Sequence, residues 1–170
     1  TSTPATLTGS APATLAAMKA ITAGGFDITV NGTITHVSAV DLSAATDYAG
    51  IATIINNKLG SAATCTYTTG SFKITTALAS GVATLTYANA DVQDLAKSMG
   101  LLSTSGGILT KGNTAEGPVD ALNTFVQMSY DGYGIVLDKM YRDSANAVSV
   151  AEWAQANKKV YFNTTNDGNT

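Results

Sequence analysis

Hydrophobic and polar residues alternate along two pairs of short segments, and each pair is joined by a two-residue turn. The first pair spans residues 26–37 and turns at Asn31-Gly32, the dipeptide that best tolerates positive φ at both central positions of a type I′ turn. A two-residue turn fixes the register of a hairpin, so Asp27 is expected opposite His36 on one face. The other face carries three further cross-strand pairs, namely Phe26–Val37, Ile28–Thr35 and Val30–Thr33.

The second pair of segments predicts another hairpin, with its turn at residues 69–70. The same argument places Tyr67 opposite Phe72 and Cys65 opposite Ile74, all on one face. These four side chains are apolar or aromatic, so this face is expected to point into the core.

A longer segment over residues 46–59 has the spacing of a helix, with Thr46 as the expected N-cap and Gly60 directly after its end. Its apolar residues recur every three or four positions, which gives the helix one buried side. They are Tyr48, Ile51, Ala52, Ile55 and Leu59.

Two shorter helices and one more strand complete this part of the pattern. A helix is expected over residues 11–21, a strand over residues 82–87, and a second short helix before Gly100. The last helix carries Val92, Leu95, Ala96 and Met99 on one side. Helices over a small antiparallel sheet can bury a core, so this part predicts an α+β fold.

The pattern changes in the turn-rich stretch before Pro118, where another helix is expected to begin. Apolar runs at residues 133–137 and 160–162 predict strands on either side of a helix over residues 148–158. That helix carries Val148, Ala151, Trp153 and Ala154, with Trp153 as a core anchor. The resulting βαβ unit should have a right-handed crossover, and alone it cannot cover both faces of its sheet. We therefore expect a fragment of a larger α/β domain.

Composition excludes several classes of function. Only 12% of the 170 residues are charged, about half of the roughly 25% usual in soluble domains, and the net charge is −3. A nucleic-acid-binding protein needs clustered Lys and Arg to neutralise phosphates, so no nucleic-acid partner is expected. No apolar run reaches the ~20 residues of a membrane helix, so no membrane partner is expected either.

Charge is also distributed unevenly, because most charged residues lie from Asp91 onwards. Together with the change of pattern, this predicts three parts. They are an N-terminal segment with a short helix at residues 1–25, an α+β domain at 26–110, and a partial α/β segment at 111–170. The chain begins with Thr rather than Met, so we expect it to be a piece of a longer protein.

The candidate chemical groups do not assemble into an active site. His36 and Asp27 could be two members of a catalytic triad, but no serine lies at a strand-to-helix turn to serve as the third, so we interpret them as a surface pair. Cys65 falls on the apolar face of its hairpin, where a free thiol behaves as a small hydrophobic residue. Asp91 and Asp94 fall around the start of a helix, where carboxylates are favoured. We nominate no catalytic, cofactor-binding or metal-binding residue, and we expect neither a cofactor nor enzymatic activity.

Four short motifs are shared with a known family. They are F-x-I-x-V-x-G at residues 26–32, D-L-S at 41–43, A-E-x-P at 115–118 and W-x-x-A-x-x-K at 153–159. Through these motifs and the longer stretches around them, residues 16–163 resemble the sheath proteins of bacteriophage contractile tails of the myovirus type.

The resemblance implies an inserted α+β domain followed by part of an α/β sheath core. It implies a structural subunit that stacks helically around the tail tube, drives contraction by rigid-body movement and exchanges terminal strands with its neighbours. The partners would be other sheath subunits and the tail tube, in a virion made in the cytoplasm of the host bacterium. The fragment alone is expected to be monomeric or weakly associated.

The first stretch also resembles the insertion modules of flagellins and flagellar hook-associated proteins. A surface-exposed flagellar-type or adhesin-like module that binds host glycans is therefore the alternative. The part after Pro118 favours the sheath, because its βαβ pattern differs from the long coiled helices of a flagellin.

Overall fold

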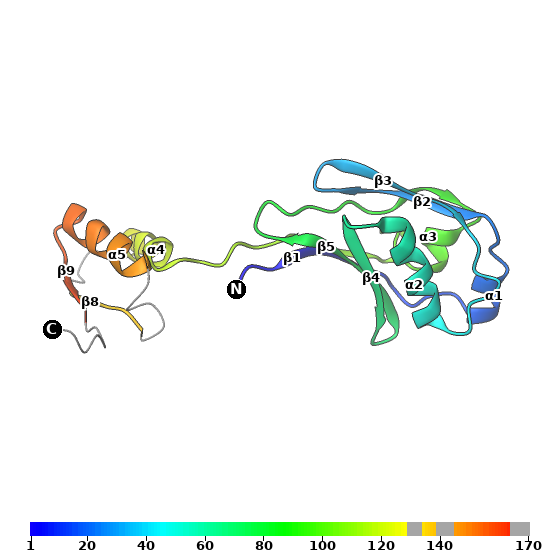
Figure 1. The fold of residues 1–170 in the computed structure, drawn as a ribbon, viewed down its shortest axis with the longest axis horizontal. Coiled ribbons are helices and arrows are strands. Elements are labelled where there is room, and N and C mark those ends of the chain that lie inside the picture. Colours follow the sequence, from blue (N-terminus) through cyan, green and yellow to red (C-terminus); the bar gives the residue numbers. More distant parts are fainter. Residues whose placement is uncertain (129–133, 139–144, 164–170) are drawn as a thin grey trace. The chain divides into compact units, whose positions relative to one another are not determined.

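The computed structural model describes residues 1–128, 134–138 and 145–163. Helices and antiparallel sheets make the protein an α+β protein, as predicted. The chain divides into two units, residues 1–115 and 116–170, which we call unit 1 and unit 2 and describe separately (Figure 1).

The first predicted hairpin forms two strands of a three-stranded antiparallel sheet in unit 1. Asp27 lies opposite His36, which confirms the predicted register. Asn31 and Gly32 have φ angles of 50° and 83°, as a type I′ turn requires. The strand order is β3-β2-β6, with β2 at Gly24–Val30, β3 at Thr33–Val40 and β6 at Asn89–Val92.

The second hairpin belongs to a four-stranded antiparallel sheet of the same unit. Cys65 pairs with Ile74 and Tyr67 with Phe72, again in the predicted register. The strand order is β4-β5-β1-β7, with β1 at Pro4–Thr8, β4 at Ala63–Thr68, β5 at Ser71–Ala79 and β7 at Ile108–Thr110.

Strand β1 lies in the middle of this sheet, between β5 and β7. Ala5 and Leu7 are fully buried, whereas Thr6 and Thr8 lie on the outer face. The sequence predicted only an extended N-terminal segment here, because two apolar residues in a threonine-rich stretch give too short an alternation to indicate a central strand. The N-terminal residues are thus an integral part of the core of unit 1.

The first and the last residues of unit 1 lie beside each other. The Thr3 N–H donates to the Asn113 C=O at 2.8 Å, and the Asn113 N–H donates to the Thr3 C=O at 3.0 Å. The Ala115 N–H also donates to Ser2 Oγ at 3.0 Å. The two ends of unit 1 are therefore joined by hydrogen bonds.

The strand predicted at residues 82–87 is wrong. Apart from an isolated bridge at Leu85, these residues form no strand, and β6 supplies the third strand of the sheet. Beside β2, a side chain takes the place of a backbone acceptor, because the Thr29 N–H donates to Thr86 Oγ1 at 3.0 Å. Val92, predicted on a helix face, belongs to β6 and is exposed.

The longest helix of unit 1 begins at Tyr48, and its N-cap is Asp47 rather than the predicted Thr46. Asp47 Oδ1 accepts a hydrogen bond from the Gly50 N–H at 2.7 Å, and Gly60 ends the helix with a φ of 64°. As predicted, this helix buries Ile51, Ala52, Ile55 and Leu59. The helices of the unit are α1 at Leu15–Lys19, α2 at Tyr48–Leu59 and α3 at Leu95–Ser98, with a 3₁₀ turn at Ser103–Ser105.

One hydrophobic core joins the two sheets of unit 1. Helix α2 lies against β3 of one sheet and β4 of the other, so a helical layer connects them (Figure 1). The largest fully buried side chains come from both sheets, the helices and the loops, and they are Phe26, Phe72, Leu7, Met18, Ile28, Leu42, Ile51, Ile55, Ile74, Leu95, Met99 and Leu101.

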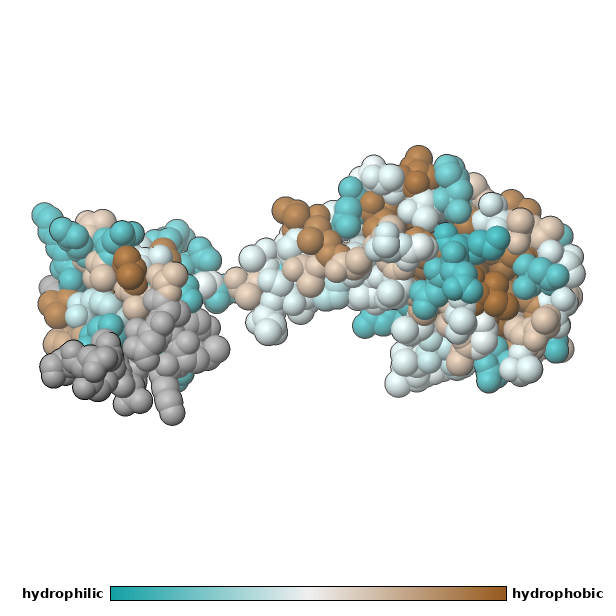
Figure 2. Space-filling model, viewed as in Figure 1, coloured by the Kyte–Doolittle hydropathy of each residue, from teal (hydrophilic) through white to brown (hydrophobic). Residues whose placement is uncertain are grey.

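The outer face of the four-stranded sheet is rich in threonine. The pairing register aligns Thr64, Thr75, Thr6 and Thr110 in one row across β4, β5, β1 and β7. Threonine suits exposed strand positions because its branched side chain fits the pleated surface while its hydroxyl faces water. On the visible face of unit 1, strongly hydrophilic residues form separate groups among near-neutral and hydrophobic ones (Figure 2).

Unit 2 contains the predicted βαβ arrangement, in which β8 and β9 pair in parallel. The helix between them starts at Ala145 rather than at residue 148, and it buries Ala147, Val150 and Ala154 while Val148 is exposed. Small residues occur on several sides of this helix, so the spacing of its apolar residues did not identify the buried side. The elements are α4 at Pro118–Met128, β8 at Gly134–Val136, α5 at Ala145–Ala156 and β9 at Val160–Phe162, and the predicted strand residue Tyr133 lies outside the described residues.

The central position of β1 predicts unequal effects at two adjacent residues. Leu7→Ala should lower the free energy of unfolding of unit 1 by about 2–5 kcal/mol, because it leaves a cavity in the core. Thr8→Ala, the matched change on the outer face, should cost less than about 1 kcal/mol. Urea unfolding followed by far-UV circular dichroism measures both, and equal losses would contradict this placement of β1.

Candidate functional site

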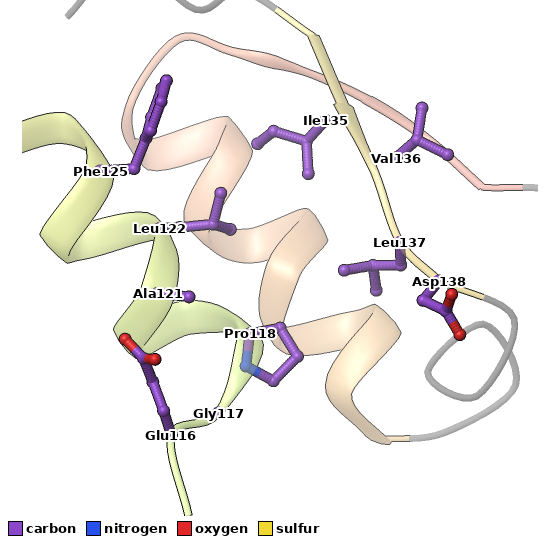
Figure 3. Close-up of a pocket in the computed structure, with 10 residues that line it drawn as sticks. All are labelled: Glu116, Gly117, Pro118, Ala121, Leu122, Phe125, Ile135, Val136, Leu137 and Asp138. Atoms are coloured by element: carbon purple, nitrogen blue, oxygen red, sulfur yellow. The ribbon is translucent and has the colours of Figure 1, made fainter. Parts of the chain in front are cut away.

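An apolar groove lies between helix α4 and strand β8 of unit 2 (Figure 3). Its volume is about 480 Å³. Pro118, Leu122 and Phe125 line it from the helix, and Ile135 and Leu137 line it from the strand and the residue that follows. Apolar side chains thus face each other across a hollow that the described residues leave open.

The local sequence explains why helix α4 forms one wall. Proline fits the first turn of a helix because it lacks the N–H that would have no partner there. Asp120 Oδ2 accepts a hydrogen bond from the Gly117 N–H at 3.2 Å, which fixes the chain just before Pro118. Leu122 and Phe125 are three residues apart, so both lie on the side of the helix that faces β8.

A second hollow, of about 220 Å³, continues the groove along β8. Glu116 and Asp138 line the first hollow, whereas Lys159 lines the second, so carboxylates and an ammonium group lie in different parts of the groove. The side chains common to both hollows are Leu122, Phe125, Ile135 and Val136. An extended polypeptide with apolar residues would match this arrangement better than a small polar molecule.

Trp153 closes one part of the groove and ties the two helices together. Its Nε1–H donates a hydrogen bond to Asn123 Oδ1 at 2.6 Å, which connects α5 to α4. The side chain is partly buried and also lines the second hollow. Trp153 therefore connects the two helices but does not belong to the core cluster of unit 2, so the prediction of a core anchor is wrong.

The outer face of the β8–β9 sheet is apolar and uncovered by the described residues. Val136, Val160 and Phe162 are 66%, 53% and 58% exposed. On the inner face, Ile135 and Tyr161 pack against the buried residues of this unit. Parallel strands are usually buried on both faces, so this sheet lacks a covering layer. We call Leu122, Phe125, Val136, Val160 and Phe162 together the apolar surface of unit 2.

The predicted surface pair of unit 1 is present. His36 Nδ1 lies 2.6 Å from Asp27 Oδ1, and the His36 side chain is well exposed. Within the described ranges no third side chain bonds to this pair, and no group of three or more His, Cys, Asp and Glu residues could hold a metal ion. An exposed pair of this kind adds little to stability.

Cys65 is buried in the core, as predicted. Burial raises the pKa of its thiol to about 12, because the low-dielectric core disfavours the thiolate. The Cys65 N–H donates to Asn56 Oδ1 at 2.5 Å, which joins β4 to α2. A protonated, buried thiol is a poor nucleophile at neutral pH, so Cys65 has a structural role.

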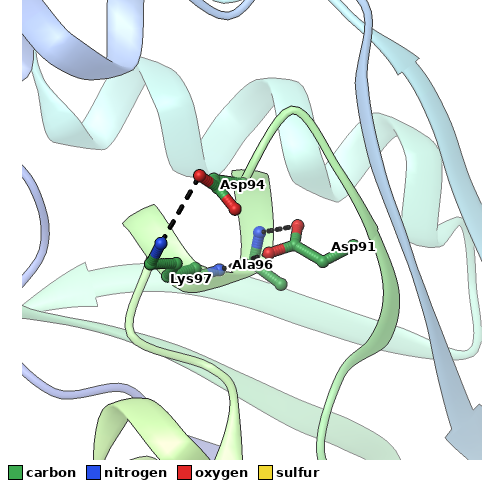
Figure 4. A network of polar contacts seen from close by, with 4 residues as sticks. All are labelled: Asp91, Asp94, Ala96 and Lys97. Carbon is green, nitrogen blue, oxygen red and sulfur yellow. Dashed lines mark hydrogen bonds and ion pairs between the residues drawn. The ribbon is translucent and has the colours of Figure 1, made fainter.

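The carboxylates near helix α3 also bind backbone groups rather than a ligand (Figure 4). The two Asp91 oxygens accept hydrogen bonds from the Ala96 N–H at 2.7 Å and the Lys97 N–H at 3.0 Å. Asp94 and Lys97 form a 3.5 Å ion pair that is exposed to solvent. The sequence placed Asp91 and Asp94 around the start of a helix, and the structure agrees.

The sequence did not identify the groove of unit 2. Its two walls come from α4 and β8, and pattern analysis alone does not bring these elements together. One signal was available, namely that a single βαβ unit leaves one face of its sheet uncovered. That signal indicated an incomplete layer but not which residues form its surface.

Most of unit 1 matches a known protein family. A family model described as "E217 tail sheath protein gp31, insert domain" matches residues 2–113, which is more than half of the chain. The matched range ends close to the boundary of unit 1 at Ala115. No curated protein matches the chain.

The buried thiol predicts a pH dependence of stability. Its pKa is 9.0 when exposed and about 12 when folded, so between these values the unfolded chain loses a proton that the folded chain retains. The free energy of unfolding should therefore fall by about 1.4 kcal/mol per pH unit from pH 9 to pH 12 through this group. Urea unfolding of the wild type and Cys65→Ala measures this contribution, and identical slopes would refute it.

Proposed function

Because the chain belongs to the tail sheath insert domain family, it is part of a phage tail sheath subunit, and we propose that this subunit stacks helically around the tail tube and drives contraction. The observation that carries the assembly role is the apolar surface of unit 2. A soluble unit rarely leaves both the face and the edge of a parallel sheet uncovered.

Unit 1 has the properties of a domain inserted into another fold. The family match covers residues 2–113, and the hydrogen bonds between Thr3 and Asn113 bring the two ends of that range together. We propose that the inserted domain ends at Asn113 and that the residues after it belong to the sheath core, which therefore begins slightly later than the expected residue 111. The match supports the first part of this division, and the βαβ order of unit 2 supports the second.

Neighbouring polypeptide completes unit 2 in this proposal. An extended strand from another subunit would occupy the groove beside β8, with apolar side chains on Leu122 and Phe125. Glu116, a carboxylate that lines the first hollow, would attract a basic residue on that strand.

The remaining proposals follow from membership of a structural family. The subunit is a non-enzymatic component of the virion, made in the bacterial cytoplasm, and its partners are other sheath subunits and the tail tube. No helix among the described residues combines the length and apolar content needed to cross a bilayer. The chain alone should form no stable ring or filament.

The packing of aromatic residues gives no support to the glycan-binding alternative. Tyr48 and Tyr67 stack on each other with ring centroids 4.8 Å apart, and both contact Phe72. A sugar needs an accessible aromatic face for stacking, and this cluster uses its faces internally. The flagellar-type or adhesin-like module therefore remains the second hypothesis.

A charge placed on the apolar surface of unit 2 should block assembly without unfolding the chain. Val136→Asp in the sheath protein of the phage should yield tails without an ordered sheath, because a buried carboxylate at the subunit contact has no partner. Val82→Asp is the matched control, since Val82 is 76% exposed in unit 1. Electron microscopy of tails measures the outcome, and normal sheaths in the Val136→Asp phage would overturn the proposal.

A further inference from the structure

Unit 1 has four strands at the edges of its two sheets, and these strands differ in how many backbone groups they offer to another chain. At the β4 edge, Asn56 Oδ1 accepts the hydrogen bond of the outward-facing Cys65 N–H. Strands β7 and β6 have only three and four residues, and Ala90 of β6 has a φ of 47°. Short or distorted edge strands offer few consecutive groups to a partner.

Strand β3 is the longest of these four edge strands. It has eight residues, pairs only with β2 among the described strands, and contains no proline, lysine or acidic residue. Its exposed edge therefore lacks the usual features that prevent sheet extension. Ile34 on this strand is also 57% exposed, which leaves an apolar side chain beside the open edge.

The register of the hairpin shows which backbone groups point outward. In a hairpin closed by a two-residue turn, the pair Val30–Thr33 is hydrogen-bonded, and bonded pairs then alternate with non-bonded pairs. Ile34 and His36 belong to non-bonded pairs, so their N–H and C=O groups face away from β2. Strand β2 shows the same alternation. Thr29 is the partner of Ile34 in a non-bonded pair, and its N–H donates away from β3, to Thr86 Oγ1.

We propose that β3 pairs antiparallel with β3 of a second copy of this chain, in a register centred on Thr35. This register places Ile34 opposite His36 of the second copy, and His36 opposite Ile34 of the second copy. Each of these two pairs then exchanges both of its backbone hydrogen bonds. The two three-stranded sheets become one continuous six-stranded sheet.

The side chains and charges suit this self-pairing. No charged residue faces a like charge, because His36 meets an isoleucine rather than the second histidine. Unit 1 carries five Asp and five Lys residues, with no Glu or Arg, so the unit that makes this contact has no net charge, and the −3 of the chain lies in unit 2. The imidazole remains beside Asp27, at a distance of 2.6 Å, and needs no new partner.

The fold also limits the extent of the contact. A bulge follows Val37, where Ala39 has a φ of 50° and the pairing with β2 shifts, so regular pairing covers residues 33–37. A strand of this length buries far less than the roughly 1,200–2,000 Å² of a stable interface, so the dimer forms only at high concentration. A two-fold contact is closed and reverses direction, so it joins free subunits rather than successive subunits of one helical stack.

Cysteine cross-linking tests the register. Two Thr35→Cys residues would face each other in a non-bonded pair, where the Cα atoms are about 4.5 Å apart and a disulfide can form. Under mild oxidation at high protein concentration, this variant should give disulfide dimers at least about tenfold faster than Thr33→Cys, whose residue faces Val37 of the second copy. The native Cys65 is buried and should not react in either variant. Equal rates in the two variants would overturn the register.

Sedimentation tests the contact itself. The 170-residue chain should show a concentration-dependent monomer–dimer equilibrium, and Ile34→Pro should raise its dissociation constant at least about tenfold, because proline removes an outward N–H from each copy. Circular dichroism checks that Ile34→Pro folds. If this variant does not fold, the Thr35→Cys cross-linking experiment decides the test. Val136→Asp should leave the dimer unchanged, which separates this contact from the apolar surface of unit 2. A wild-type chain that stays monomeric at all concentrations would refute the proposal.

Discussion

A strand at the edge of a sheet leaves a row of backbone N–H and C=O groups that need partners, and this constraint distinguishes the two units. In unit 1, seven strands form two sheets over a shared core, and side chains or short strand lengths protect most of the edges. In the described part of unit 2, two strands of three residues each have only one another. Helix α5 packs on one face of this small sheet, whereas the exposed apolar residues of its other face are not covered by any described residue.

Polar side chains in unit 1 mainly complete the hydrogen bonding of the backbone. Asp47 and Asp91 accept bonds from helical N–H groups, Asn56 accepts one from β4, and Thr76 Oγ1 accepts one from the Ala5 N–H inside the core. Groups engaged in this way are not available for chemistry on a ligand. The outer face of the four-stranded sheet therefore presents mainly threonine hydroxyl groups to solvent.

The parts of the fold that were predictable are those fixed by nearby residues. Asn31-Gly32 and the turn at residues 69–70 set the registers of both hairpins, and the spacing of α2 identified its buried side. Strand β1 was not predictable in this way, because its partners in β5 lie about seventy positions further along, as the bond from Ala5 to Thr76 shows. The groove of unit 2 was missed for the same reason, since α4 and β8 meet only through tertiary packing.

The hydrogen-bonded pair Thr3–Asn113 has a consequence for the history of such proteins. A module whose two ends meet can be removed from a host polypeptide by rejoining a single surface loop, and it can be transplanted into another host at a similar loop. Recombination at one surface loop therefore suffices to gain, lose or exchange such a domain, and the rest of the host polypeptide keeps its sequence.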